Sequence, residues 1–530
     1  MRRGKTYQQS FRIRKGDFAG AYAFADDLLT RKDVSKETAH EALLVFEALL
    51  QKLVDSGVDE NTDLRISGMD KLGDFRIKIM FEGPMFVPDY DTTDSIEDRI
   101  LRGYDDRIDC SYYSGCNTIT ISVSRRNRSL FSCAIAFLCA IVVYLPLSCL
   151  LDADAQKELL TGYVFPVEKV YANAMLMIGA PMTFFSLLKN LTNTYVMAQI
   201  NSGLRQLQAR TLATSAVAII LAFAVFLVLV IPLSSMETGL YGSGITHLES
   251  LNTSFSEVVG TIVTPSIFEP FEAVSPVPLM VVALLCTYAL CSAGKFFDPL
   301  RHAMMACYTL FSRMLHVSIA ALPFFFFLSM LDVLLEDGLI VIIELFGYFV
   351  AASLGVLLLF GTYAIRLRAH DIKIIPFVRN IIPLLRENLR IGSVINAAPY
   401  NTRYCAKNMK MSRSMLERNL PLLAEINLDG NCFLLMFFAL ATSFVMGKYL
   451  TWVNIVGLGL LVLLLSLGAP NQPGSILIGM LILTTYLNSS NALCTAIYLE
   501  AFFGSTQNLI NVIGDIVMVA IEDKKEKALA

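Results

Sequence analysis

The sequence predicts an α-helical membrane protein with several spanning segments, preceded by a small α+β domain outside the membrane. The mean hydropathy of the 530 residues is +0.56, and only 17% of them are charged, whereas a soluble chain carries roughly a quarter. Polar and apolar residues are also separated along the chain, because the sequence is polar up to about residue 128 and dominated by long apolar runs after it. We therefore expect a domain of residues 1–128 and a transmembrane domain of residues 129–530.

The expected domain of residues 1–128 combines one amphipathic helix with strands. Ala42–Val54 places its leucines and Phe46 on one helical face. Strand-like alternation follows in Phe75–Phe81 and Ile119–Val123. This order predicts a sheet covered by a helix.

The apolar segments after residue 128 are the candidate spans. A spanning helix needs about 20 predominantly apolar residues, and several of these segments are shorter. Short apolar segments interrupted by Gly or Pro are typical of broken or re-entrant helices. The segments are Leu130–Leu151, Val164–Leu188, Thr211–Leu233, Leu279–Ala293, His302–Leu331, Leu339–Ile365, Cys432–Met446, Val453–Leu467, Ile476–Leu487 and Ala492–Ile521.

The basic residues predict the orientation in the membrane. Arg125, Arg126 and Arg128 directly precede the first segment, whereas the connection Ser234–Thr264 contains no Lys or Arg. Because short cytoplasmic loops carry the excess of Lys and Arg, we expect a multi-pass protein of the cell membrane with a cytoplasmic N-terminus. No cleavable signal peptide is visible at the N-terminus.

Charge and cysteine usage argue against other classes. A net charge of −3 is too small to indicate a nucleic-acid partner. The eleven cysteines lie mostly in apolar stretches without a CxxC pair. We interpret them as buried structural thiols, with metal ligation as the alternative.

Polar groups inside apolar sequence mark two candidate ion-binding segments. Asn427-Leu-Asp-Gly430 interrupts one helix, and Asn511 and Asp515 share a face of another because they are four residues apart. An unpaired carboxylate in a bilayer is costly, so Asp429 and Asp515 are expected to line an aqueous or ion-filled site. The alternative is that each pairs with a neighbouring helix and serves packing.

Four motifs in the same order and spacing resemble the dicarboxylate/amino acid:cation symporters, the glutamate/aspartate transporter family. Leu420-Pro-Leu…Ile426-Asn-Leu-Asp-Gly430 resembles the broken seventh span, and Asn511-Val-Ile-Gly-Asp515 resembles the last span. Ser466–Gly474 is similar to the tip of the second re-entrant hairpin, and Tyr163–Ser186 to the second span. The resemblance covers about Leu130 to Asp523.

The resemblance implies about eight spans and two re-entrant hairpins, arranged as scaffold and moving transport domains in a homotrimer. It also implies cation sites. Asn427, Asn511 and Asp515 would hold one sodium ion, and Asp429 with Asn427 would contribute to another. The backbone of Ser466, Leu467 and Ala469 would help to form a third. Such oxygen ligands suit a hard cation like sodium.

Several departures from the family pattern concern the substrate. The aspartate and arginine that grip the substrate in the last span are replaced by Gly504 and Gln507. The tip of the first hairpin is identified with Asn396-Ala-Ala-Pro399. Loss of the arginine removes the bidentate partner of a substrate carboxylate, so aspartate and glutamate are expected to be poor substrates. The expected substrate-binding residues are Asn396, Asn431, Gln472, Glu500, Gly504, Gln507, Asn508 and Asn511.

Two further departures concern the ions. Glu425 replaces a threonine beside a presumed ion site. It either supplies a proton or stands in for a coupling ion, or it is a partnered or lipid-edge glutamate. The tyrosine and the threonine-serine pair that bind ions in the family's third span have no clear counterpart here.

The first 128 residues resemble the small GHKL ATPase fold of anti-sigma-factor kinases. Glu47 and Gln51 lie where that family has ExxxN, and Phe81-Glu-Gly-Pro-Met85 where it has DxGxG. Asn117-Thr-Ile-Thr is similar to the closing strand. Because Gln51 and Phe81 replace the residues that hold magnesium and read adenine, ATP binding is not expected, and a regulatory or docking role is.

We therefore predict a secondary active transporter, not an enzyme, that couples a small organic solute to sodium, with a proton as the alternative ion. The expected partners are the solute, membrane lipid, further copies in a homotrimer and a cytoplasmic regulator of residues 1–128. A transporter-like sensor that signals through this domain is the alternative. A channel is a third possibility, which the broken-helix motifs disfavour.

Overall fold

The computed structural model of the chain divides into two compact units, Met1–Asn127 and Arg128–Ala530. Each unit is described by itself. The structure describes residues 7–31, 34, 36–56, 58–59, 61–71, 74–84, 86, 101, 108–113, 115–123, 129–200, 202–231, 249–250, 262–292, 297–445, 448–469, 473–487 and 492–529.

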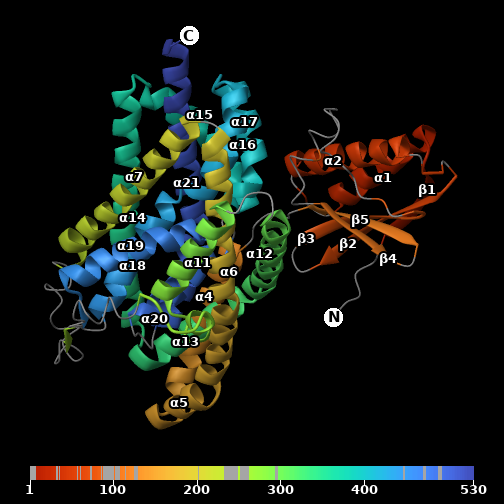
Figure 1. The fold of residues 1–530 in the computed structure, drawn as a ribbon. Coiled ribbons are helices and arrows are strands. Elements are labelled where there is room, and N and C mark those ends of the chain that lie inside the picture. The colour runs from red at the N-terminus through yellow and green to blue at the C-terminus, as the bar shows by residue number, and fades with distance from the viewer. Residues whose placement is uncertain are drawn as a thin grey trace. The chain divides into compact units, whose positions relative to one another are not determined.

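The N-terminal unit is an antiparallel five-stranded sheet with two helices on one face (Figure 1). The strand order is β1-β2-β3-β5-β4, and every neighbouring pair is antiparallel. The strands are β1 (Tyr7–Arg12), β2 (Asp63–Lys71), β3 (Asp74–Glu82), β4 (Ile108–Tyr113) and β5 (Cys116–Val123). A 3₁₀ turn, Lys15–Asp17, leads into α1 (Phe18–Thr30), and α2 spans Lys36–Asp55.

The core of this unit forms because apolar residues recur at the spacing that places them on one face of each strand and helix. Residues of β5 alternate between half-buried and buried positions, which is the period of a strand with one covered face. On α2 the side chains of Leu43, Phe46 and Leu50 are buried toward the sheet. The predicted helix lies within α2, and the two predicted strands lie within β3 and β5, so these three element predictions are confirmed.

In the described residues of the second unit, the regular structure is helical apart from the two-residue strands β6 (Glu249–Ser250) and β7 (Lys448–Tyr449). Short π-helical turns, Leu160–Val164 and Phe226–Val230, lie before α6 and after α7. The helices are α4 (Ser129–Leu150), α5 (Ala153–Leu159), α6 (Phe165–Ile200), α7 (Ser202–Val225), α10 (Glu269–Glu272), α11 (Pro276–Ser292), α12 (Asp298–Ile319), α13 (Leu322–Asp337), α14 (Ile340–Ala369), α15 (Ile374–Ile391), α16 (Val394–Asn408), α17 (Arg413–Ile426), α18 (Asp429–Val445), α19 (Trp452–Leu467), α20 (Ser475–Tyr486) and α21 (Ala492–Leu529).

One predicted span is divided. The apolar run His302–Leu331 forms α12 and α13, whose axes differ by 53° across a break of a few residues. Pro323 lies in the first turn of α13. Proline lacks a backbone N–H and is favoured at the start of a helix, so it begins a new helix there.

Six helices of the described residues are long and apolar enough to cross a membrane, or seven if the bent pair α12–α13 counts as one span. These helices differ in the fraction of their residues that is buried inside the protein. In the most apolar window of Arg413–Phe444, 94% of the residues are buried, and the corresponding value for Thr495–Lys527 is 78%. For Phe131–Leu150 it is 17%. The helices with the polar motifs are thus central, and α4 exposes apolar side chains at the periphery.

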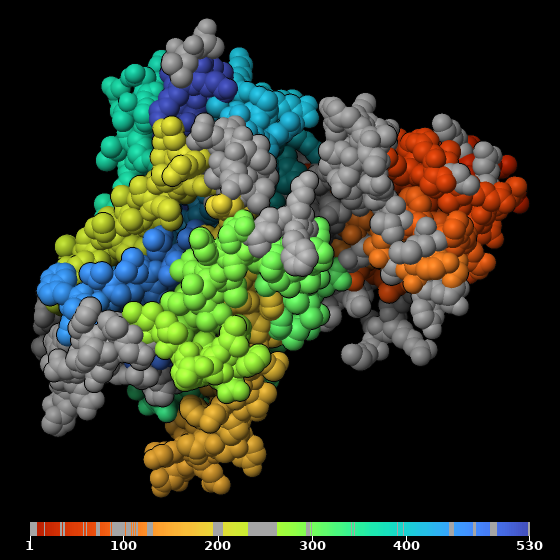
Figure 2. All heavy atoms as spheres, in the orientation of Figure 1, coloured from red at the N-terminus to blue at the C-terminus, as the bar shows by residue number. Residues whose placement is uncertain are grey.

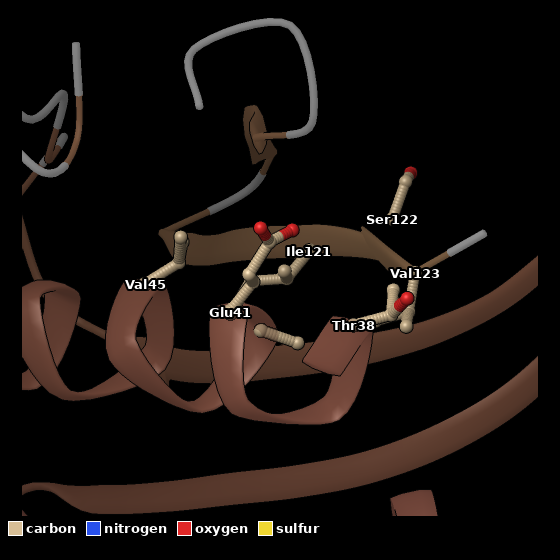
Figure 3. Close-up of a pocket in the computed structure, with 7 residues that line it drawn as sticks. Thr38, Glu41, Val45, Ile121, Ser122 and Val123 are labelled. Carbon is tan, nitrogen blue, oxygen red and sulfur yellow. The ribbon is translucent and has the colours of Figure 1, made fainter. Parts of the chain in front are cut away.

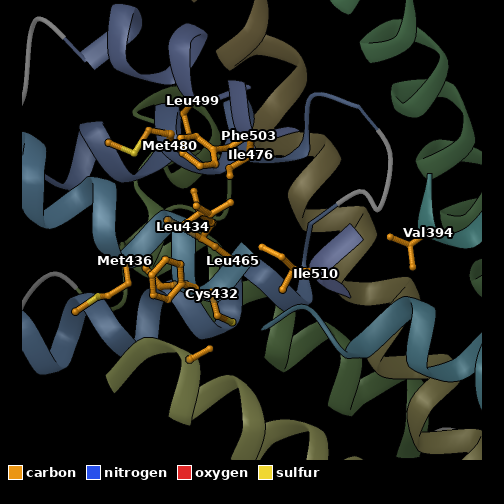
Figure 4. Packing of buried hydrophobic residues seen from close by; sticks show 14 of the residues in the cluster. Val394, Cys432, Leu434, Met436, Leu465, Ile476, Met480, Leu499, Phe503 and Ile510 are labelled. Carbon is orange, nitrogen blue, oxygen red and sulfur yellow. The ribbon is translucent and has the colours of Figure 1, made fainter. Parts of the chain in front are cut away.

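Apolar side chains from four helices pack around the centre of this unit. Cys432 and Leu434 on α18, Leu465 on α19, Ile476 on α20 and Ile510 on α21 belong to one buried cluster (Figure 4). Distant parts of the chain also meet at the surface, where α7 (yellow), α19 (blue) and α11 (green) lie side by side (Figure 2). The central polar groups are therefore surrounded by an apolar shell.

Candidate functional site

The candidate site lies at the break between α17 and α18. Asn427 leaves the helical conformation (φ −96°, ψ 90°), and α18 begins at Asp429. The side chains of Asn427, Asp429 and Asn431 are fully buried. The break therefore places amide and carboxylate groups in the interior of the helical unit.

Helix α21 approaches this break closely, and Gly430 makes the approach possible. A Cβ atom at Gly430 would lie 2.8 Å from the backbone oxygen of Gln507 and 2.9 Å from Oδ1 of Asn511. Instead, the backbone N–H of Gly430 donates to Oδ1 of Asn511 at 2.9 Å. A glycine is needed here because any side chain would push α21 away.

The residues predicted to hold the first ion come together at this contact. Nδ2 of Asn427 donates to Oδ1 of Asp515 at 2.9 Å, and Asn511 lies one turn before Asp515 on the same face of α21. Gly514 leaves room for the pair, since a Cβ there would lie 2.9 Å from Nδ2 of Asn427. Asn427, Asn511 and Asp515 thus form one buried cluster.

Asp429 is held by two hydroxyl groups from other helices. The Ser215 hydroxyl on α7 donates to Oδ1 at 3.0 Å, and the Tyr363 hydroxyl on α14 donates to Oδ2 at 3.0 Å. Thr214 also donates to Oδ1 of Asn427 at 3.4 Å. We refer to Asn427, Asp429, Asn511 and Asp515, with Thr214, Ser215 and Tyr363, as the carboxylate site.

The sequence showed no clear counterpart of the family's threonine-serine pair, but two adjacent hydroxyl residues of α7 contact this site. Thr214 and Ser215 are adjacent on the long apolar helix α7 and contact both Asn427 and Asp429. The tyrosine of the site comes from α14 instead, where sequence reasoning did not look for it. A Thr-Ser pair amid apolar residues in Ala213–Ile219 was the available signal.

The carboxylate site concentrates negative charge in an apolar interior. Within the described part of the chain, neither Asp429 nor Asp515 forms an ion pair with a basic side chain, and their hydrogen-bond partners are hydroxyl and amide groups. Arg366 on α14 interacts electrostatically with Asp429 without an ion pair, and it offsets at most one of the two negative charges. Two ionised carboxylates buried in this way need a positive charge to compensate them. Carboxylate, amide and hydroxyl oxygens are the ligands of a hard cation.

Gln507 and Asn508 are buried with unused hydrogen-bonding atoms. Nε2 of Gln507 and Oδ1 of Asn508 have no partner among the described residues, although Nδ2 of Asn508 donates to the Gly392 carbonyl at 2.9 Å. Asn431 and Asn511 lie close by, with Asn431 donating to Ser475 Oγ at 3.2 Å. A buried donor and a buried acceptor that remain unpaired are typical of a ligand site.

The segment that we assigned to the tip of a first hairpin is helical. The chain breaks at Gly392 and Ser393, between α15 and α16, whereas Asn396-Ala-Ala-Pro399 lies inside α16. Gly392 adopts a left-handed conformation (φ 71°) that ends α15. The side chain of Asn396 and the whole of Gln472 lie outside the described residues.

Glu500, which we expected among the substrate-binding residues, uses its carboxylate within the protein. Its two carboxylate oxygens accept the backbone N–H groups of Gly474 at 2.8 Å and Leu477 at 3.2 Å. Glu500 therefore caps the N-terminus of α20, where a negative charge is favoured. A Cβ at Gly504 would lie 2.6 Å from Glu500 Oε1, so the cap leaves no space for a side chain at position 504.

Glu425 has a basic partner, which agrees with the interpretation of this residue as a partnered glutamate. Nζ of Lys189 on α6 lies 3.1 Å from Oε1 of Glu425. The carbonyls of Leu467 and Ala469, expected near a third ion, accept hydrogen bonds from the same helix. Ser466 is buried, and its Oγ has no partner among the described residues.

The sequence model described as "Sodium:dicarboxylate symporter family" matches residues 130–525 of the 530. No curated protein matches the chain.

Proposed function

The chain belongs to the sodium:dicarboxylate symporter family, and on this premise we propose that it is a sodium-coupled secondary transporter of a small polar organic solute. The family is one of transporters, and the several apolar helices make the chain a multi-pass membrane protein. Within the family, the proposal is that the solute is not a dicarboxylic amino acid.

The buried carboxylates carry the proposal for ion coupling. Asp429 and Asp515 converge from two helices, α18 and α21, with no basic side chain of the described residues bonded to either. Arg366 on α14 interacts electrostatically with Asp429 but forms no ion pair with it, and one arginine offsets at most one of the two negative charges. Sodium, at Asn427, Asp429, Asn511 and Asp515, supplies the missing charge, and a bound proton is the alternative.

The substrate class follows from the groups that remain unpaired. Gln507 offers an N–H donor and Asn508 a carbonyl acceptor, which suits a neutral polar or monocarboxylate solute. The sequence between Tyr449 and Ile521 contains no Lys or Arg that could pair with a second carboxylate. Glu500 already occupies N–H groups at the start of α20, so it would repel an acidic substrate there.

The N-terminal unit is proposed to be a cytoplasmic regulatory domain with a degenerate GHKL-like fold. Its position before the first span, with Arg125, Arg126 and Arg128 at the junction, supports the cytoplasmic side. A homotrimer is proposed from the family. The second candidate function is a sensor that signals through this unit, because the unit has a core of its own.

Uptake by purified protein in liposomes tests the proposal. Radiolabelled neutral amino acids and monocarboxylates are offered with and without an inward sodium gradient, in wild type and in the Asp515→Asn variant. We expect uptake of at least one solute that needs sodium, is lost in the variant and is not reduced by micromolar aspartate. Ligand binding without sodium-driven uptake would instead favour the sensor, and strong competition by aspartate would contradict the substrate class.

A further inference from the structure

Helix α6 presents four polar side chains on one face toward the candidate site. Ser186, Lys189, Asn190 and Asn193 are spaced by three, four and seven residues, which places them on the same side of the helix. They contact the C-terminal ends of two helices, α17 and α19. We call these four residues the α6 polar face.

At α19 the polar face satisfies backbone carbonyls. Nδ2 of Asn190 donates to the Leu467 carbonyl at 2.8 Å, and the Ser186 hydroxyl donates to the Ala469 carbonyl at 3.2 Å. Ser186 and Asn190 are almost fully buried. The last carbonyls of a helix lack partners within the helix and carry its partial negative charge, so this end of α19 attracts donors and cations.

At α17 the polar face neutralises a carboxylate. Glu425 lies in the last turn of α17, where the helix dipole disfavours a negative charge. Nζ of Lys189 lies 3.1 Å from its Oε1, and Asn193 donates to Oε2 at 3.5 Å. The same Nζ lies 4.6 Å from the ring centroid of Tyr308, a distance at which an ammonium is attracted to an aromatic face.

We propose that Lys189 is a tethered cation that takes the place of one coupling sodium ion beside Glu425, at the end of α17. The oxygen groups expected to hold an ion there, the Glu425 carboxylate and the Leu467 and Ala469 carbonyls, are all bonded to the α6 polar face. The inference rests on the proposed sodium-coupled transport. It confines sodium to the carboxylate site and lowers the number of ions bound by each protomer.

The physical reason is that an ammonium group and a sodium ion can each neutralise the same carboxylate. Both place one positive charge beside the Glu425 carboxylate, but the ammonium belongs to the chain and is neither taken up nor released. Removing it leaves the Glu425 carboxylate without its cation, while the Leu467 and Ala469 carbonyls keep their bonds to Asn190 and Ser186. A free sodium ion with its preference for oxygen ligands then binds where Nζ was.

The experiment counts sodium ions. Radiolabelled sodium at saturation is measured on purified full-length protein for wild type, Lys189→Gln, Lys189→Arg, Lys189→Gln combined with Glu425→Gln, and Asp515→Asn. We expect Lys189→Gln to bind about one more sodium ion per protomer than wild type. The gain should be absent in Lys189→Arg, which keeps the charge, and in the double variant, which lacks the carboxylate.

The remaining outcomes separate the inference from the proposed function. Lack of sodium binding in wild type, or no loss in Asp515→Asn, contradicts the proposed function itself. If Asp515→Asn loses bound sodium but Lys189→Gln binds as many sodium ions as wild type, the inference is overturned while the proposed function stands. If Lys189→Gln unfolds, its thermal stability should be restored by sodium but not by choline. Absence of that rescue, with Lys189→Arg stable, also overturns it.

Discussion

At the scale of single residues, Asp429 depends on two hydroxyl groups that are distant in the sequence. Ser215 and Tyr363 come from α7 and α14, and each donates to a different oxygen of the carboxylate. Donors on both oxygens fix the plane of the carboxylate without neutralising its charge. An ion that enters the site therefore meets a carboxylate that is already oriented.

The first prediction concerns that charge. Asp429→Asn and Asp515→Asn preserve the shape of each side chain but remove a negative charge that a bound cation needs. We expect at least a tenfold loss of apparent sodium affinity in either variant, which corresponds to about 1.4 kcal/mol. The measurement is a sodium titration of purified protein, followed by the sodium-dependent shift of its unfolding temperature.

Asp332→Asn is the matched control, because Asp332 is a buried carboxylate on α13 that takes no part in the carboxylate site. It should retain the sodium response of wild type. Wild-type sodium affinity in both site variants would show that these carboxylates serve packing instead.

The site residues that could be predicted from the sequence are those whose polarity differs from that of their neighbours along the chain. Asn427, Asp429, Asn511 and Asp515 are polar residues in apolar runs, and the structure brings them into one cluster. Tyr363 was not found, because a tyrosine in a spanning helix is unremarkable until its partner, 66 residues away, is known. Lys189 was missed for the same reason, since its partner Glu425 lies on another helix.

At the scale of elements, the contact between α20 and α21 depends on Glu500 and Gly504. Glu500 uses both oxygens to cap α20, and Gly504, one turn later on α21, gives the carboxylate its space. The sequence showed the loss of a side chain at position 504 but not its reason. The carboxylate that stands one turn earlier occupies that space.

The second prediction is that Gly504→Ala lowers the stability of the wild-type protein but raises the stability of a Glu500→Ala variant. In wild type, Gly504→Ala forces the Glu500 carboxylate to move and breaks its cap on α20, which should cost about 1–3 kcal/mol. In the Glu500→Ala background the obstacle is absent, and alanine in place of glycine inside a helix should stabilise by up to about 1 kcal/mol. Thermal unfolding of the four proteins of this cycle measures the coupling. Additive effects of the two substitutions would contradict the proposed contact.

The apolar helices were predictable because a continuous run of apolar residues is a strong signal, whereas their breaks were not. The bend between α12 and α13 falls within one predominantly apolar segment, shortly before Pro323. The break between α15 and α16 falls at Gly392 and Ser393, before the segment Asn396-Ala-Ala-Pro399 that we assigned to a hairpin tip. Breaks depend on packing between helices, which periodicity along one chain does not record.

At the scale of the whole molecule, the chain combines a helical membrane unit with an N-terminal unit that has its own core. The proposal that the N-terminal unit has a degenerate GHKL-like fold raises the question of whether ATP regulates transport. The described part of this unit offers little to a nucleotide. The Gln51 amide donates to Asp55 at 3.0 Å, and the Phe81 ring is buried against Phe86.

A hollow between α2 and β5 is also too small for a nucleotide. It has space for about one water molecule. Figure 3 shows the Glu41 carboxylate between Val45 and Ile121 in this hollow, which would repel a phosphate group. The residues that line the hollow are Thr38, Glu41, Ala42, Val45, Ile121, Ser122 and Val123.

The last prediction follows from these features: neither the full-length protein nor its Met1–Asn127 fragment should bind ATP at millimolar concentration, with or without magnesium. Asparagine at the position of Gln51 and aspartate at that of Phe81 would supply the missing ligands, so Gln51→Asn combined with Phe81→Asp is the matched gain-of-binding variant. Calorimetry on both forms measures the affinity, and circular dichroism verifies that the fragment and the variant are folded. Micromolar affinity in wild type would overturn the prediction, and it would make the N-terminal unit an energy sensor for the membrane unit.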